Sequence, residues 1–87
     1  MPNLAFAEKA WDEYLYWQEN DKKTLKRINL LIKDIIRNGN DGIGKPEHLR
    51  HRDAWSRRID DVNRLVYRLK ANDLIEILQC KGHYDDR

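Results

Sequence analysis

The spacing of apolar residues changes once along this chain, and that change limits the folds open to it. Before Asn38, apolar residues recur every three or four positions, which predicts helices over residues 8–20 and 22–38, the second capped by Asp21. After the glycine-rich segment NGNDGIGKP they recur every second position, which predicts strands. A short apolar stretch at the start adds a further strand. The predicted strands cover residues 3–7, 54–59, 64–70 and 74–80.

We therefore expect an α+β fold of order β-α-α-β-β-β: a small antiparallel sheet with two N-terminal helices packed on one face. The length of 87 residues allows one domain, residues 1–87, with one modest core. We find neither a secretory leader nor an apolar run of membrane-spanning length. The lone Cys80 has no partner for an internal disulfide. These features favour a cytoplasmic protein with no membrane contact.

Two arginines are expected to face each other across a hairpin. A loop at residues 60–62 would set Arg58 opposite Arg64, on the sheet face that also carries Ser56, Val66 and Arg68. That face is too cationic to receive apolar helices and is predicted to stay open. The helices are then expected on the face of Trp55, Arg57, Ile59, Leu65, Tyr67 and Leu69. Opposed like charges destabilise a sheet unless they are neutralised. Arg58 and Arg64 either bind an anion or pair with Glu47, Glu76 or Asp85.

The distribution of charge agrees with an anionic partner. Residues 45–70 carry eight basic side chains against four acidic ones, whereas residues 1–43 carry seven of each. A polyanion such as RNA fits that local excess, although an ordinary solvated surface explains it as well.

Two motifs are set aside. The segment GNDGIGK matches a phosphate-binding P-loop until Pro46 replaces the final Ser or Thr, and it follows a predicted helix rather than a strand. The pairs His48-x-x-His51 and Cys80-x-x-His83 have zinc-like spacing, but in an order that fits no familiar zinc finger. We therefore expect no metal and no cofactor.

A third grouping suits cleavage of a phosphodiester by side chains. A carboxylate such as Glu47 takes the proton from an RNA 2′-hydroxyl, and an imidazolium such as His83 protonates the leaving 5′-oxygen. Arg58 and Arg64 stabilise the charge that builds on the phosphate oxygens. The alternative is that Glu47 is an ordinary loop carboxylate and His83 a solvated terminal residue.

Long stretches of the sequence resemble the YoeB (Txe) toxins of bacterial toxin–antitoxin modules, in the RelE superfamily. The resemblance rests on segments that run in the same order over nearly the whole chain: WDEYLYWQENDKKTLKRINLLIKDI, GKPEHL, WSRRID, NRLVY and a terminal HY. It implies a ribosome-dependent endoribonuclease that cuts the mRNA codon in the A site. By position, the catalytic residues would be Glu47, Arg64, His83 and Tyr84, and the RNA phosphates would contact Lys45, Arg50, His51 and Arg58.

The resemblance also implies partners. These are the bacterial ribosome and mRNA, a second copy of the chain in a homodimer, and a YefM/Phd-type antitoxin through which the complex would reach operator DNA. The chain departs from the family in its PEHL segment and in the residues Asp85, Asp86 and Arg87 that follow the HY pair. Two other functions remain open: a ParE-like toxin that acts by binding a protein, and a corepressor subunit without activity.

Overall fold

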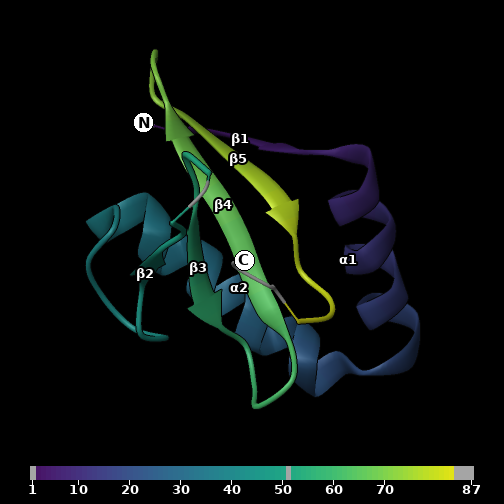
Figure 1. The fold of residues 1–87 in the computed structure, drawn as a ribbon. Helices are drawn as coiled ribbons and strands as arrows, with labels where there is room; N and C mark the ends of the chain where they lie inside the picture. Colours follow the sequence, from purple (N-terminus) through teal and green to yellow (C-terminus); the bar gives the residue numbers. More distant parts are fainter. Residues whose placement is uncertain (1, 51, 84–87) are drawn as a thin grey trace.

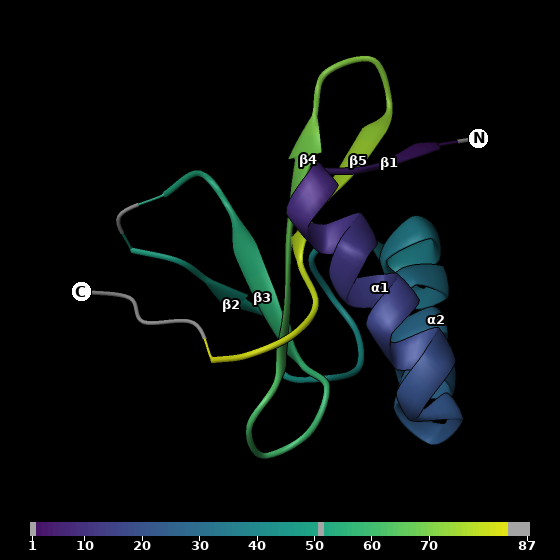
Figure 2. The same cartoon turned by 90° about the vertical axis from the view of Figure 1, so that its right-hand side faces the viewer.

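The computed structural model describes residues 2–50 and 52–83, and it places two helices on one face of a five-stranded sheet (Figure 1). Its elements are β1 (Asn3–Phe6), α1 (Glu8–Asn20), α2 (Lys22–Asn38), β2 (Glu47–His48), β3 (Trp55–Arg58), β4 (Arg64–Lys70) and β5 (Leu74–Gln79). The strand order is β1-β5-β4-β3-β2. Figure 2 shows both helices on the same side of the sheet, with the β2–β3 hairpin turned to the other side.

The predicted α+β class and the packing of both helices on one face are confirmed, and every predicted helix and strand is present. Two features of the sheet differ from the expectation. The sheet is mixed, because β1 pairs with β5 in parallel while the other neighbours are antiparallel. A fifth strand, β2, adds to β3 through only two residue pairs, too few to produce a visible alternation of apolar residues.

The helices are set by local signals. The Asp21 carboxylate accepts a hydrogen bond from the backbone N–H of Thr24 at 3.1 Å and caps α2. Gly39 ends α2 with a positive φ of 65°, which favours glycine. In the described part of the chain, neither helix has the length and apolar character that a membrane span requires.

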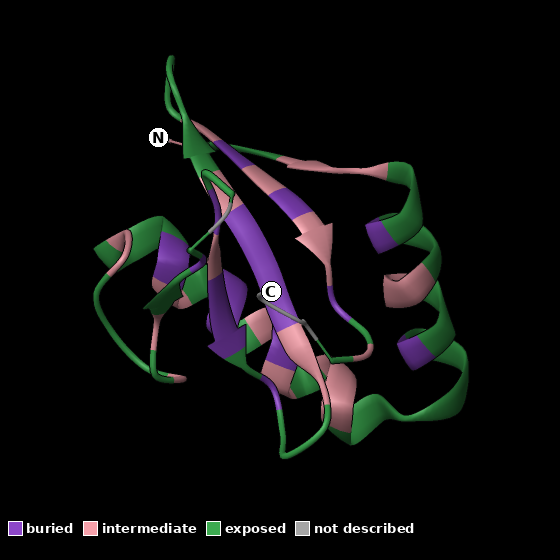
Figure 3. Ribbon diagram, viewed as in Figure 1, coloured by how far each residue is buried: buried purple, intermediate pink, exposed green. Residues whose placement is uncertain are grey.

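The main core lies between the helices and the sheet (Figure 3). The buried apolar side chains of α2 recur on one face of the helix, as the sequence predicted: Ile28, Leu31, Ile32 and Ile35. They pack with alternating residues of the strands, among them Leu65, Tyr67, Ile75 and Ile77. The amphipathic pattern of α2 therefore explains why the helices cover this face.

The opposite face of the sheet is less open than predicted. Leu49 and Ala54 fold over the middle of this face and bury Val66, with Leu78 packed at the margin. Ser56 is buried as well. The expectation of a wholly open arginine-rich face is thus wrong at its centre, because the chain between β2 and β3 folds back over the sheet. This face stays accessible toward its ends, at Arg58 and Arg64 on one side and at the part-exposed Arg68 on the other.

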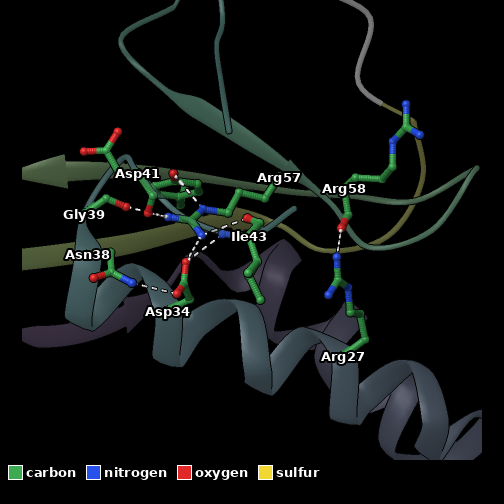
Figure 4. Close-up of polar contacts among 9 residues, drawn as sticks. Arg27, Asp34, Asn38, Gly39, Asp41, Ile43, Arg57 and Arg58 are labelled. Atoms are coloured by element: carbon green, nitrogen blue, oxygen red, sulfur yellow. Dashed lines mark hydrogen bonds and ion pairs between the residues drawn. The ribbon is translucent and has the colours of Figure 1, made fainter. Parts of the chain in front are cut away.

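The largest surprise is a fully buried arginine. Arg57 points from β3 toward α2, as the predicted face requires, and its side chain is 0% exposed (Figure 4). It forms an ion pair with Asp34 of α2. Its other N–H groups donate to the Tyr67 hydroxyl at 3.2 Å and to three carbonyls of the loop after α2: Gly39 at 2.6 Å, Asp41 at 2.9 Å and Ile43 at 2.9 Å.

We predict that Arg57→Leu lowers the free energy of unfolding by about 3–5 kcal/mol, because it leaves a carboxylate and three part-buried carbonyls without their partner. Urea unfolding measures the loss. The control is Arg68→Leu, which removes a part-exposed arginine whose Nε lies 3.2 Å from Glu76, and a change below about 1 kcal/mol is expected. Equal losses in the two variants would contradict this account.

Candidate active site

A pocket of about 250 Å³ lies on the face of the sheet away from the helices, at the end that carries Arg58 and Arg64. It is lined by Lys45, Glu47, Ser56, Arg58 and Arg64. These residues come from the loop before β2 and from three neighbouring strands. The pairing explains how they meet: Glu47 is opposite Ser56, and Arg58 is opposite Arg64. Because directly opposed residues share a face, one carboxylate and three cations gather here.

The turn between β3 and β4 positions the two arginines. The Asp60 carboxylate accepts hydrogen bonds from the backbone N–H groups of Val62 at 2.8 Å and Asn63 at 2.6 Å. The Arg64 guanidinium donates to the Asp60 carbonyl at 3.0 Å. The predicted loop at residues 60–62 and the pairing of Arg58 with Arg64 are therefore confirmed.

The C-terminal segment is tied to the start of β4. The backbone N–H of Arg64 donates to the Gly82 carbonyl at 3.0 Å, and the Gly82 N–H donates to the Asn63 side-chain oxygen at 2.7 Å. Gly82 has φ of 91°, a conformation that residues with a side chain rarely adopt. Figure 2 shows this segment, in yellow, leaving β5 toward the face opposite the helices. His83 thus follows directly after a residue bonded to Arg64.

Helix α1 contacts the same segment two residues earlier, at Cys80. The Cys80 N–H donates to the Glu13 carboxylate at 2.8 Å, and the Trp17 indole donates to the Cys80 carbonyl at 2.8 Å. Burial, with the nearby Glu13 charge, raises the pKa of the Cys80 thiol to about 12, so the thiol stays protonated. Cys80 is therefore a buried structural residue at the exit of β5.

The predicted site residues fall into three groups. Lys45, Glu47, Arg58 and Arg64 line the pocket together. His83 and Arg50 are exposed and are not among its lining residues, although Gly82 anchors His83 beside Arg64. Predicted site residues outside the described part of the chain are His51 and Tyr84.

The surface-pairing alternative for the two arginines finds little support. Glu76 pairs instead with Arg68 at 3.2 Å and with Lys70 at 3.9 Å. Across residues 2–50 and 52–83, no ion pair within 4.0 Å involves Arg58 or Arg64, while Asp85 lies outside these ranges. Arg58 and Arg64 are therefore paired residues that line one pocket without an ion-paired carboxylate in this region, an arrangement suited to an anion.

The geometry of the glycine-rich loop differs from that of a P-loop. Three of its carbonyls point inward to the Arg57 guanidinium, whereas a P-loop directs its N–H groups at a phosphate. Within residues 2–50 and 52–83, no three His, Cys, Asp or Glu side chains are grouped to hold a metal ion; His51 of the zinc-like spacing lies outside them.

Sequence reasoning missed three residues of this region. Ser56 lines the pocket, and its alternation with Arg58 along β3 was the available signal. Asn63 and Gly82 tie the C-terminal segment to the turn before β4 through a hydrogen bond between residues 19 positions apart. No local sequence pattern predicts such a contact.

A family model for the YoeB-like toxin of bacterial type II toxin–antitoxin systems matches residues 6–84. This chain belongs to that family. A YoeB toxin from Synechocystis is 54% identical over 83 residues, which are 93% of this chain and 95% of the relative.

Solved structures of relatives have the same fold. A heterotetrameric YoeB–YefM toxin–antitoxin complex from Staphylococcus aureus contains a chain with a TM-score of 0.87 and 46% identity, covering 97% of this chain and 99% of that one. A YoeB dimer from the same organism gives a TM-score of 0.89 at 46% identity, covering 95% of this chain and 98% of that one.

We predict that the turn joining the two arginines loosens in acid. Burial works to raise the pKa of Asp60, but hydrogen bonds from Asn63 and Val62 outweigh it and hold this pKa below its usual value of 3.8. A depressed pKa in the folded state contributes stability above the unfolded pKa and loses it as the pH falls through the folded one. Unfolding free energy, measured by urea at a series of pH values, should fall below about pH 4.

The matched variant is Asp60→Asn. It should be less stable than the parent at neutral pH and should show a smaller loss in acid. An identical pH dependence in the two proteins would contradict the role given to this carboxylate.

Proposed function

We propose that this protein is a ribosome-dependent mRNA endoribonuclease toxin that cuts the codon in the A site. The observation that supports the proposal most is the pocket in which a carboxylate from β2 meets opposed arginines from β3 and β4, beside an anchored C-terminal segment. Family membership agrees with a toxin role. The pocket adds side chains of the types that phosphodiester cleavage requires.

In the proposed reaction, Glu47 takes the proton from the RNA 2′-hydroxyl, and the 2′-oxygen attacks the adjacent phosphorus. The bond from phosphorus to the 5′-oxygen breaks as His83 donates a proton to that oxygen, which yields a 2′,3′-cyclic phosphate and a 5′-hydroxyl. Arg64 faces the phosphate oxygens and stabilises their growing charge, with Arg58 beside it. All bond making and proton transfer thus involve the RNA and these side chains.

The remaining residues would hold the substrate. Lys45 lines the same pocket and contacts a phosphate as a point charge. Arg50 and His51 extend the contact along the RNA backbone, and Tyr84 stacks on or orients a base. Such a target places the protein in the bacterial cytoplasm.

We further propose that the chain forms a homodimer and is inhibited by a YefM/Phd-type antitoxin, by analogy with the YoeB dimer and the YoeB–YefM complex of Staphylococcus aureus. An acidic antitoxin segment that folds on binding is complementary to Arg58 and Arg64 and would cover the pocket. Operator DNA would then be bound only through the antitoxin in the complex.

We predict that Glu47→Ala lowers mRNA cleavage on programmed ribosomes by about 10²- to 10⁴-fold, because one positioned proton acceptor is lost. Primer extension on a defined mRNA, with and without ribosomes, measures the cleavage. His83→Gln should reduce it similarly while the protein stays folded and still binds the antitoxin.

The control is Asp12→Asn, which changes an exposed carboxylate of α1 outside the pocket and should cut as the parent does. Unchanged cleavage by Glu47→Ala would remove this residue from the mechanism. A parent protein that binds a protein target but leaves mRNA intact would favour the ParE-like alternative.

We also predict that RNA binding weakens steeply as salt rises, since cations at the pocket release counterions from the phosphates. Arg58→Ala should reduce the slope of log affinity against log salt by about one. Fluorescence anisotropy with a labelled, non-cleavable RNA measures both slopes. Equal slopes for Arg58→Ala and the parent would show that this arginine does not contact phosphate.

A further inference from the structure

We propose that the buried pair of Arg57 and Asp34 is a positioning device that sets Glu47 in the pocket by ordering the loop before β2. The inference rests on the proposed function for its kinetic test. It concerns residues on the opposite face of the sheet from the pocket, and Figure 4 shows Arg57 and Arg58 pointing in opposite directions from β3.

Every N–H group of the Arg57 side chain has a hydrogen-bond acceptor. A guanidinium has five N–H donors, and each of those of Arg57 has an acceptor: Tyr67, Asp34, Ile43, Gly39 and Asp41. Three of the acceptors are loop carbonyls at alternate positions along residues 39–43. A single side chain therefore defines the path of this loop.

Asp34 orders the loop from its other side. One of its carboxylate oxygens accepts from the backbone N–H of Ile43 at 3.1 Å as well as from Arg57, and the other accepts from Asn38 at 2.8 Å. Gly42 has φ of 130°, and a Cβ added there would overlap the Asp34 carboxylate. The loop thus packs so closely that only glycine fits at this position.

Residues 44–47 connect the ordered loop to the pocket. The Gly44 carbonyl accepts from the backbone N–H of Arg58 at 2.7 Å, which joins the loop to β3. Lys45 follows with φ of 52°, uncommon for a residue with a side chain. Glu47 comes two residues later, in a strand with only two residue pairs. So short a strand has little stability of its own, so the preceding loop acts together with the pairing to β3 in setting where Glu47 lies.

The test is a double-mutant cycle between Asp34→Asn and Glu47→Ala, with the cleavage rate on programmed ribosomes as readout. Asparagine keeps the shape of the side chain but loses the charge that holds Arg57. We expect kcat to fall by about 10- to 100-fold with KM nearly unchanged, since misplaced catalytic groups act mainly on kcat. When Glu47 is already absent, Asp34→Asn should change the residual rate by less than about 2-fold.

The control is Asp41→Asn in the same loop, whose exposed side chain is changed while its backbone carbonyl still binds Arg57. It should cleave at the parental rate. Circular dichroism and an unfolding curve establish that each variant is folded. If Asp34→Asn does not fold, Tyr67→Phe takes its place in the cycle, because it removes one acceptor of Arg57 and keeps the ring; a smaller loss of kcat, again absent without Glu47, is expected.

Hydrogen exchange supplies a readout without catalysis. The Arg58 amide, bonded to the Gly44 carbonyl, should exchange at least about 10-fold faster in Asp34→Asn than in Asp41→Asn. A folded Asp34→Asn that cleaves at the parental rate, or that loses the same factor with and without Glu47, overturns the inference. A parent protein without cleavage overturns the proposed function instead, and the exchange result then decides the inference alone.

Discussion

The burial of one arginine organises this small protein. Arg57 lies in the core with no exposed surface, so each of its donors has to find an acceptor inside the protein. The acceptors come from α2, from β4 and from the loop that leaves α2. Because an unpaired charge is costly in the interior, the three elements are held together by one side chain. The loop is followed by Lys45 and by Glu47 of β2, which line the pocket on the other face of the sheet.

A second set of contacts performs the same task for the C-terminal segment. Helix α1 binds the backbone of Cys80 on both its N–H and its carbonyl, and Asn63 and Arg64, at the entry to β4, bind Gly82 in the same way. Two residues of a terminal segment, where chains usually fray, thus have their backbone groups paired. The pocket is lined by a carboxylate and opposed arginines, and one of these arginines, Arg64, is bonded to the anchored segment through Gly82.

Much of this arrangement could be predicted from the sequence. The period of the apolar residues gave both helices and four strands, and the length of the β3–β4 loop placed Arg58 opposite Arg64. The choice of Lys45, Glu47, Arg58 and Arg64 as site residues agrees with their meeting in one pocket, while their roles remain proposals. The parallel pairing of β1, the strand β2 and the cover of Leu49 over the sheet escaped prediction, because they depend on contacts between distant segments.

By itself, the sequence determined both helices, the strands β1, β3, β4 and β5, the faces of β3 and β4, and the family resemblance. These depend on neighbouring residues, through helical or alternating spacing, capping and turn length. Only the tertiary structure decided that Arg57 is a buried hub rather than another surface cation, and that Gly82 brings the C-terminal segment to Arg64. The reason is that a guanidinium at an inward position has no predictable partner until the core is packed. The backbone carbonyls that accept from Arg57 cannot be recognised in the sequence, since every residue has a backbone carbonyl.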